Sequence, residues 1–351
     1  MSVNLSGKKV LFFSVKTFNL EIEIKKKMEQ AGAQVTYFDE RPANNNFTKG
    51  IIRLRRSLYE RTITRYYEHI LKSLKQEKFD YLFVNRGEVI PAFFLEQFRK
   101  DNPHCEFIFH TWDSFSNHVY PLSILKYFDR KFSFDPSDCL EHGLNFRPLF
   151  YLDDFATVAD DVAGENEQYK MLFLGTAHSD RYMVSTNVAN WFHQAGYETF
   201  CYYFMHGRIV YFYKVLFDRE FQKFDWKKLS FKSLTKKEII DLYRRSDIIL
   251  DINHPGQAGL TMRTLEAIGA NKKLITTNKN IARYPFYNSN NVFILDREQL
   301  NLNEDFLQTP YLLMEETVKE SLSIGGWLKD IFDHDEAAFW PGYLAEHYTR
   351  V

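Results

Sequence analysis

The densest group of residues that could carry chemistry lies within residues 251–278. This stretch begins in an apolar run, passes through a turn rich in Gly and Pro, and enters a segment with helical spacing near Thr261. Free N–H groups at a helix N-terminus favour phosphate, and glycines let a diphosphate approach the backbone. The candidate phosphate-binding residues of this turn are His254, Gly256, Gly259, Leu260 and Thr261.

Arg263 and Glu266 add charged groups to the same helix start. They are three residues apart, so they share one helix face. A guanidinium in the first turn can bind the diphosphate through forked donors, and a carboxylate one turn further can accept both ribose hydroxyls. An ordinary surface ion pair is the alternative, but the Gly-rich turn and His254 favour nucleotide binding.

A second loop predicts the same ligand. An apolar run at residues 170–174 leads into a turn that again combines backbone N–H groups, hydroxyls and a cation. Such donors can stabilise the charge that develops on a leaving nucleoside diphosphate. The candidates in this loop are Gly175, Thr176, His178 and Arg181. The only Asp-x-Asp sequence, residues 333–335, does not follow a strand, so we expect no metal site and no cofactor.

Strands and helices alternate along the chain and position these loops. Apolar runs such as residues 10–15 and 80–85 predict buried parallel strands, and helical spacing fills the segments between them. This rhythm predicts an α/β fold with two Rossmann-like doubly wound domains that face a cleft.

The expected domains are residues 1–155 and 168–310. An acidic linker at residues 152–168 separates them. Residues 311–351 are expected to form C-terminal helices that pack back on the first domain.

Residues 251–278 resemble the donor half of GT-B glycosyltransferases, particularly those of bacterial surface-polysaccharide (lipopolysaccharide and capsule) and spore-coat clusters. The resemblance rests on a Gly-containing turn, then Arg263, Glu266 and Ala267, then a strand that ends in Thr277-Asn278. It implies that Glu266 holds the ribose and that Arg263 and the turn bind the diphosphate. It covers the C-terminal domain best and the N-terminal domain only as a fold.

Three residues are candidates for catalysis on the acceptor side. His110, at a strand end, resembles the histidine that contacts the donor in the cleft of many GT-B enzymes. Asp113 follows the same strand and is the leading general base for the acceptor hydroxyl, with Glu88 as its rival. Asp113 could instead cap a helix, and a retaining enzyme would need no such base.

Composition narrows the function class. The 351 residues are 45% hydrophobic and 26% charged, with a net charge of −1, which gives no overall attraction for nucleic acid. Three scattered cysteines fit a reducing compartment, and no leader or membrane span is predicted. We expect a cytoplasmic protein, with the basic stretch from Lys49 to Tyr67 as a candidate contact to anionic lipid at the inner face of the membrane.

Three functions remain open at this point. The first is transfer of a sugar from a nucleoside-diphosphate sugar to a cell-surface glycan or lipid-linked acceptor, without a metal. The second is a sugar-nucleotide 2-epimerase with the same nucleotide site. The third is a non-catalytic subunit that binds sugar nucleotides or glycans.

Overall fold

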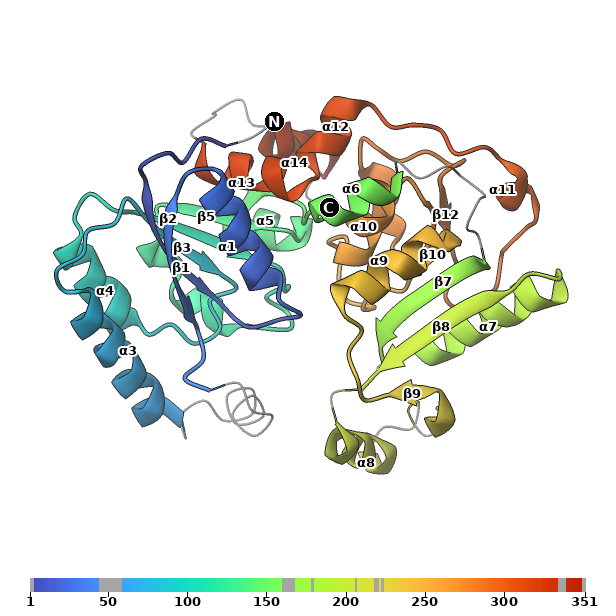
Figure 1. The fold of residues 1–351 in the computed structure, drawn as a ribbon, viewed down its shortest axis with the longest axis horizontal. Helices are drawn as coiled ribbons and strands as arrows, with labels where there is room; N and C mark the ends of the chain where they lie inside the picture. Colours follow the sequence, from blue (N-terminus) through green and yellow to red (C-terminus); the bar gives the residue numbers. More distant parts are fainter. Residues whose placement is uncertain are drawn as a thin grey trace. The chain divides into compact units, whose positions relative to one another are not determined.

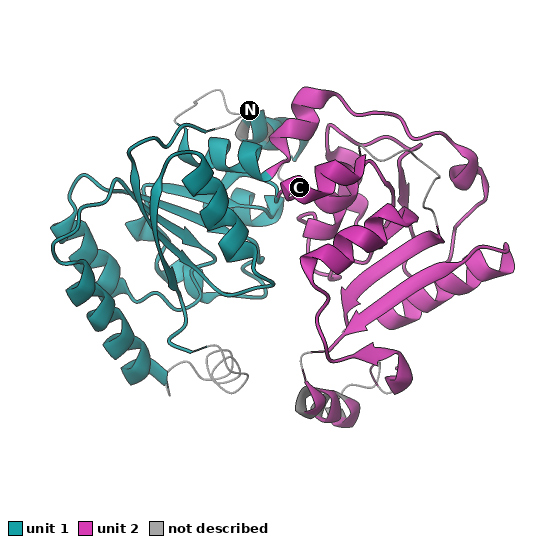
Figure 2. Ribbon diagram, viewed as in Figure 1, with its two compact units in different colours: residues 1–149, 324–351 teal, residues 150–323 magenta. Residues whose placement is uncertain are grey.

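The computed structural model describes residues 3–43, 59–159, 168–177, 180–205, 207–217, 221, 224–333 and 339–348. The chain forms two compact units (Figure 2): unit 1 comprises Met1–Leu149 and Ile324–Val351, and unit 2 comprises Phe150–Ser323. Each unit is built on a six-stranded parallel sheet with helices packed against it (Figure 1). The predicted α/β class, with two Rossmann-like doubly wound domains, is therefore confirmed.

Unit 1 has the strand order β2-β1-β3-β4-β5-β6. Its strands are β1 (Lys9–Ser14), β2 (Gln34–Asp39), β3 (Tyr81–Asn85), β4 (Glu106–Thr111), β5 (Arg130–Ser133) and β6 (Asn145–Phe146). Its helices are α1 (Leu20–Gln30), α3 (Glu60–Leu74), α4 (Ala92–Asp101), α5 (Pro136–His142), α13 (Ile324–Phe332) and α14 (Phe339–His347). Because β2 and β3 flank β1, the chain reverses its direction of travel across the sheet between β1 and β3.

Strand β1 is apolar from Val10 to Phe13 because both of its faces are covered. Phe12 stacks on Phe83 at 5.3 Å between ring centroids, and Phe83 contacts Trp327 of α13 at 5.8 Å. Phe13 points to the opposite face, where its ring lies 5.3 Å from that of Phe94 in α4. Alternate side chains of one strand thus enter two different layers, as expected for a parallel sheet between helices.

Unit 2 has the strand order β12-β11-β10-β7-β8-β9. Its strands are β7 (Tyr169–Thr176), β8 (Thr199–Phe204), β9 (Leu229–Ser230), β10 (Ser246–Asp251), β11 (Lys273–Thr276) and β12 (Val292–Ile294). Its helices are α6 (Asp153–Ala159), α7 (Arg181–Gln194), α8 (Arg208–Phe217), α9 (Lys236–Arg244), α10 (Met262–Gly269), α11 (Asp305–Gln308) and α12 (Glu316–Ser321). From β9 to β12 the strands follow the order 3-2-1-4-5-6 of a dinucleotide-binding sheet, so the reversal lies between β7 and β10.

The acidic segment before β7 is more ordered than the sequence suggests. Residues 153–159, expected to be linker, form α6, whose Phe155 packs edge-on against Tyr243 with the ring centroids 4.9 Å apart. Asp154 forms an ion pair with Lys236 at 2.8 Å. The composition of this segment did not predict a helix, because Phe155 and Val158 are the only buried residues of α6.

The basic stretch from Lys49 to Tyr67 is described only from residue 59 onward. In α3 its apolar residues Ile63 and Tyr67 are buried in unit 1, whereas Arg61 and Arg65 are exposed. This described part has the pattern of a helix that covers a core, and residues 49–58 lie outside the described residues. None of the helices in the described part of the chain is long and apolar enough to cross a bilayer.

Candidate functional site

The carboxyl ends of β7 and β10 meet at the reversal point of unit 2. β10 pairs in parallel with β7, and their ends lead into the loops before α10 and α7 (Figure 1). Open α/β sheets bind their ligands at this position, because the helix N-termini that follow the strands point toward it. Both loops chosen from the sequence therefore lie at one edge of one sheet.

Asp251, the last residue of β10, fixes the start of α10. Its buried carboxylate accepts hydrogen bonds from the hydroxyls of Thr261 (2.9 Å), Thr264 (2.8 Å) and Thr276 (3.4 Å). Thr261 is the N-cap of α10, and its hydroxyl oxygen also accepts the N–H of Thr264 at 3.3 Å. Thr261 thus shapes the helix start through its side chain, a role that the sequence pattern did not separate from ligand binding.

Arg181, the first residue of α7, joins the two loops. Its Nε donates to the carbonyl of Ile252 at 2.9 Å, and one Nη donates to the hydroxyl of Thr176 at 2.9 Å. Burial lowers the pKa of Arg181 below its ordinary value, although Asp251 opposes that effect. The other Nη makes no hydrogen bond within the described part of the chain, so the group keeps donors for an anion. His178 lies outside the described residues.

The two candidate glycines differ in what surrounds them. Gly175 belongs to β7 itself, and a Cβ there would lie 2.6 Å from the ring of Phe173. A Cβ on Gly256 would meet nothing closer than the ring of His254 at 3.9 Å. Packing alone therefore requires glycine at position 175, whereas position 256 has open space beside the backbone.

The remaining residues of the Gly-rich turn are held by an amide, an imidazole and an apolar side chain. Asn278 donates through its Nδ2 to the carbonyl of Gly259 at 3.1 Å, and the N–H of Gly256 donates to the ring of His254 at 3.4 Å. Leu260 is buried and anchors the turn against the core. Asn278, the last residue of the 251–278 stretch, thus helps to fix the Gly-rich turn near the start of that stretch.

Arg263 and Glu266 form a cluster with Tyr243 of α9. Arg263 Nη1 lies 2.5 Å from Glu266 Oε2, and it also donates to the Tyr243 hydroxyl at 3.1 Å. That hydroxyl donates to the same Glu266 oxygen at 3.1 Å. Burial raises the pKa of Glu266, and the Glu266 carboxylate overcomes the opposite effect of burial on Arg263, whose pKa is raised.

Parts of this cluster remain without partners. The Nε of Arg263 is buried and makes no hydrogen bond, and Glu266 Oε1 makes none within the described residues. From the sequence we expected Arg263 to bind the diphosphate and Glu266 to bind the ribose. In the structure Arg263 Nη1 pairs with Glu266 Oε2. The remaining guanidinium nitrogens can still donate to a phosphate, and Glu266 Oε1 can still accept from a hydroxyl.

Arg297 was not identified from the sequence. It follows β12, and its guanidinium reaches Asp180 at 2.6 Å and the side-chain oxygen of Asn253 at 2.6 Å. It therefore ties together the loops that follow β7 and β10. No motif around Arg297 indicated this, because its partners lie 117 and 44 residues away.

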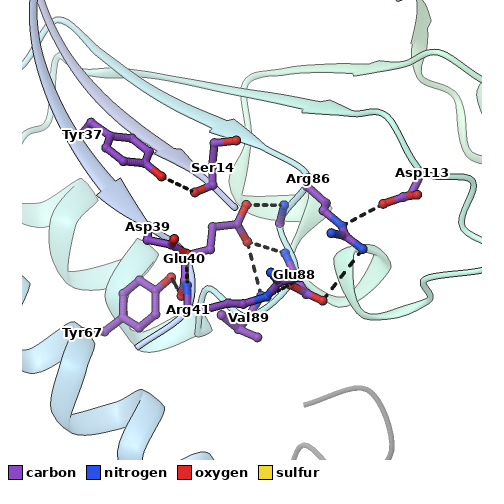
Figure 3. A network of polar contacts seen from close by, with 11 residues as sticks. Ser14, Tyr37, Asp39, Glu40, Arg41, Tyr67, Arg86, Glu88, Val89 and Asp113 are labelled. Carbon is purple, nitrogen blue, oxygen red and sulfur yellow. Dashed lines mark hydrogen bonds and ion pairs between the residues drawn. The ribbon is translucent and has the colours of Figure 1, made fainter. Parts of the chain in front are cut away.

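In unit 1 a buried carboxylate organises the loop after β3 (Figure 3). Glu40 accepts the backbone N–H of Gly87 at 2.9 Å, that of Glu88, and that of Val89 at 3.4 Å. Arg86 and Gly87 both have positive φ, at 101° and 71°, which turns successive N–H groups toward one point. Burial, reinforced by Glu88, raises the pKa of Glu40 to about 8.

The same loop carries three ion pairs, the longest of which joins Arg86 Nη2 to Glu88 Oε1 at 3.9 Å. Glu88 is buried and pairs with the equally buried Arg41 at 2.5 Å, so its carboxylate is already neutralised inside the unit. Arg86 Nε lies 2.8 Å from Asp113 Oδ2, and the Asp113 side chain remains 37% exposed (Figure 3). Of the two candidate bases, Asp113 is therefore the one that an acceptor could reach.

His110 is fully buried in unit 1. Trp327 Nε1 donates to His110 Nε2 at 3.3 Å, which leaves the proton on Nδ1 to be donated to Asn85 Oδ1 at 3.2 Å. Burial, together with the nearby charge of Arg147, lowers the pKa of His110 to about 3. Both nitrogens are thus engaged inside unit 1, and the ligand contact that the resemblance implied for His110 stays a prediction.

No protein-family model and no curated protein matches the chain. Solved structures do match its fold. A glycosyltransferase from Rickettsia africae is 15% identical, with a TM-score of 0.51 over 93% of this chain and 99% of that one. Sucrose-phosphate synthase from Thermosynechococcus elongatus is 8% identical, with a TM-score of 0.52 over 97% of each chain.

A putative UDP-N-acetylglucosamine 2-epimerase from Listeria monocytogenes is also similar. It is 12% identical, with a TM-score of 0.51 over 97% of this chain and 99% of that one. At such identities the likeness concerns the fold, which transferases and an epimerase share. The chain therefore has the two-Rossmann-domain fold of GT-B glycosyltransferases.

Proposed function

We propose that this protein is a glycosyltransferase that moves a sugar from a nucleoside-diphosphate sugar to a cell-surface glycan or lipid-linked acceptor, without a metal. The observation that carries the proposal is the Arg263–Glu266–Tyr243 cluster, at the start of the helix that follows β10. The Arg263 guanidinium and the Glu266 carboxylate are 21% and 15% exposed, and each keeps an atom that makes no hydrogen bond within the described residues, which suits a diphosphate beside a ribose.

The chemistry requires stabilisation of a leaving nucleoside diphosphate. Arg263 and Arg181 supply charged donors at the edge where the N-terminus of α10 adds the positive end of its dipole. Glu266 would accept the ribose hydroxyls through Oε1 while Arg263 and Tyr243 hold Oε2. The site is thus largely organised before the ligand binds, which lowers the entropy lost on binding.

Direct binding and turnover measurements test this proposal. Purified protein is titrated with a panel of nucleoside-diphosphate sugars, and each mixture is followed for release of free nucleoside diphosphate. Glu266→Ala should weaken binding by about 10- to 100-fold, since hydrogen bonds to a charged group contribute about 1.5–3 kcal/mol. Glu298→Ala, which removes an exposed carboxylate of the same unit, is the matched control and should bind as the wild type does.

Two further measurements distinguish a loss of nucleotide binding from a loss of folding. Glu266→Gln keeps the shape of the side chain and reports whether charge, and not folding, is responsible, while circular dichroism checks each variant. Unchanged affinity in a folded Glu266→Ala protein would refute the site. Conversion of the sugar to its epimer would instead favour the epimerase, whose fold is equally similar. Binding without either reaction would favour the non-catalytic subunit.

The acceptor-side proposal assigns the general base to Asp113. If the transfer inverts the anomeric configuration, Asp113→Asn should lower kcat by about 10²- to 10⁴-fold and leave the affinity for the donor unchanged. Arg86 would orient the carboxylate through the 2.8 Å ion pair. An unaltered kcat in Asp113→Asn would remove this assignment without affecting the donor site.

A further inference from the structure

Among the described side chains of helix α8 in unit 2, apolar residues lie both on the side that faces the core and on an exposed side. Tyr211 and Val215 pack against the buried cluster of unit 2, with the Tyr211 ring 5.8 Å from that of Phe221. Phe212 and Leu216, one position further along, are 63% and 72% exposed. With Arg208, also exposed, these two residues have a spacing of four and form one outward stripe.

The segment that leads into β9 extends this exposed surface. Trp226 is 63% exposed and Phe231 is 41% exposed. The guanidinium of Arg208 lies 5.9 Å from the centroid of the Phe231 ring, which joins the stripe on α8 to the residues after β9. Figure 1 shows α8 and β9 at the same end of unit 2. We call this surface, formed by Arg208, Phe212, Leu216, Trp226, Phe231 and the lysines described next, the α8 face.

The α8 face carries more positive than negative charge. Residues 225–238 contain five lysines and two acids, Asp225 and Glu238, and Glu238 lies 3.7 Å from Lys232. Lys227, Lys228 and Lys232 are all exposed and lie beside the two exposed aromatic residues of the segment. Because the whole chain has a net charge of −1, this concentration of cations is local.

We propose that the α8 face binds the surface of an anionic lipid bilayer. Trp and Phe side chains partition into the interfacial region of a membrane, and neighbouring lysines are attracted by anionic headgroups. An amphipathic helix whose second apolar side is exposed, flanked by cations, matches that surface in both polarity and charge. The helix would lie in the interface, since it is too short to span the bilayer.

Vesicle flotation with the full-length protein tests this proposal. Wild-type protein should float with vesicles of phosphatidylcholine containing anionic phosphatidylglycerol, and it should stay unbound with phosphatidylcholine alone. Phe212→Ser/Leu216→Ser should weaken binding by about tenfold or more for each side chain removed. Leu300→Ser/Leu313→Ser removes two exposed apolar residues elsewhere in unit 2 and should bind as the wild type does.

A variant with fewer lysines measures how much the positive charge of the α8 face contributes to vesicle binding. Lys227→Gln/Lys232→Gln should lose about fivefold in vesicle affinity for each lysine, and raising the salt concentration should weaken the wild type more than this variant. Lys100→Gln/Lys126→Gln, which removes two exposed lysines of unit 1, should have little effect.

Equal flotation of the α8-face variants and the wild type would overturn the proposal, as would failure of the wild type to bind anionic vesicles. A dimer in sedimentation that Phe212→Ser/Leu216→Ser dissociates would also overturn it, because the face would then bind a second copy. None of these results depends on glycosyl transfer.

Discussion

Replacing His110 by glutamine should change how the stability of unit 1 depends on pH. The pKa of His110 is lowered from 6.5 to about 3, because its imidazole is buried between Asn85 and Trp327. In the unfolded chain it regains its ordinary pKa. Between about pH 3 and pH 6.5 the unfolded state therefore binds a proton that the folded state does not, and stability falls as the pH is lowered through this window.

The size of the effect follows from these two values. From about pH 7.5 to about pH 5, proton binding by this histidine stabilises the unfolded chain by about 2 kcal/mol, and the folded protein gains almost nothing. His110→Gln cannot titrate, so it should lack this loss. Other groups, including Glu40, titrate similarly in both proteins and cancel in the comparison.

Urea unfolding at the two pH values measures the difference. Because the two units need not unfold together, hydrogen exchange of the peptide that contains β4 is used to report the unfolding free energy of unit 1 alone. NMR of the wild-type imidazole gives a second readout that does not require the variant to fold: its shifts should stay constant down to about pH 5. Equal pH dependence in both proteins, or an ordinary titration by NMR, would refute the buried position of His110.

Three further predictions concern stability. Gly175→Ala should destabilise unit 2 by about 1–3 kcal/mol because its Cβ would meet a buried ring at 2.6 Å, while Gly256→Ala should unfold at nearly the wild-type temperature in calorimetry. Glu88→Gln should lower stability by about 3–5 kcal/mol in urea unfolding, since Arg41 would keep a buried charge without its partner; a change below about 1 kcal/mol would contradict this. Thr235→Ala should remove the capping box of α9, with a loss of about 1 kcal/mol and faster hydrogen exchange in its first turn.

The features predictable from the sequence are those fixed by neighbours in the chain. Helix α10 begins at Met262, beside the start predicted near Thr261, because its apolar spacing and its N-terminal threonine are local signals. The capping box of Thr235 and Glu238 was likewise recognisable from a spacing of three. Helix α6 was missed, since two inward residues in seven give too little periodicity to distinguish it from a linker.

The features that sequence reasoning missed depend on distant partners. His110 is buried by Trp327, which is 217 residues away, so its position after a strand gave no sign that both nitrogens are engaged. Glu40 reaches the loop after β3 across 47 residues. Tyr243 joins Arg263 and Glu266 from a different helix. A histidine or carboxylate at a strand end is therefore a candidate until its long-range neighbours are known.

The difference between the two reversal points explains why the donor is assigned to unit 2. In unit 1 the two buried carboxylates beside β1 and β3 are already engaged, Glu88 by Arg41 and Glu40 by backbone N–H groups. A diphosphate there would have to draw Arg41 away and leave a buried carboxylate unpaired, at a penalty of several kcal/mol. In unit 2 it would add to donors that Arg181 and Arg263 already have available, and it would leave the Arg263–Glu266 pair intact. Anion binding therefore requires less rearrangement at the carboxyl ends of β7 and β10 than at those of β1 and β3.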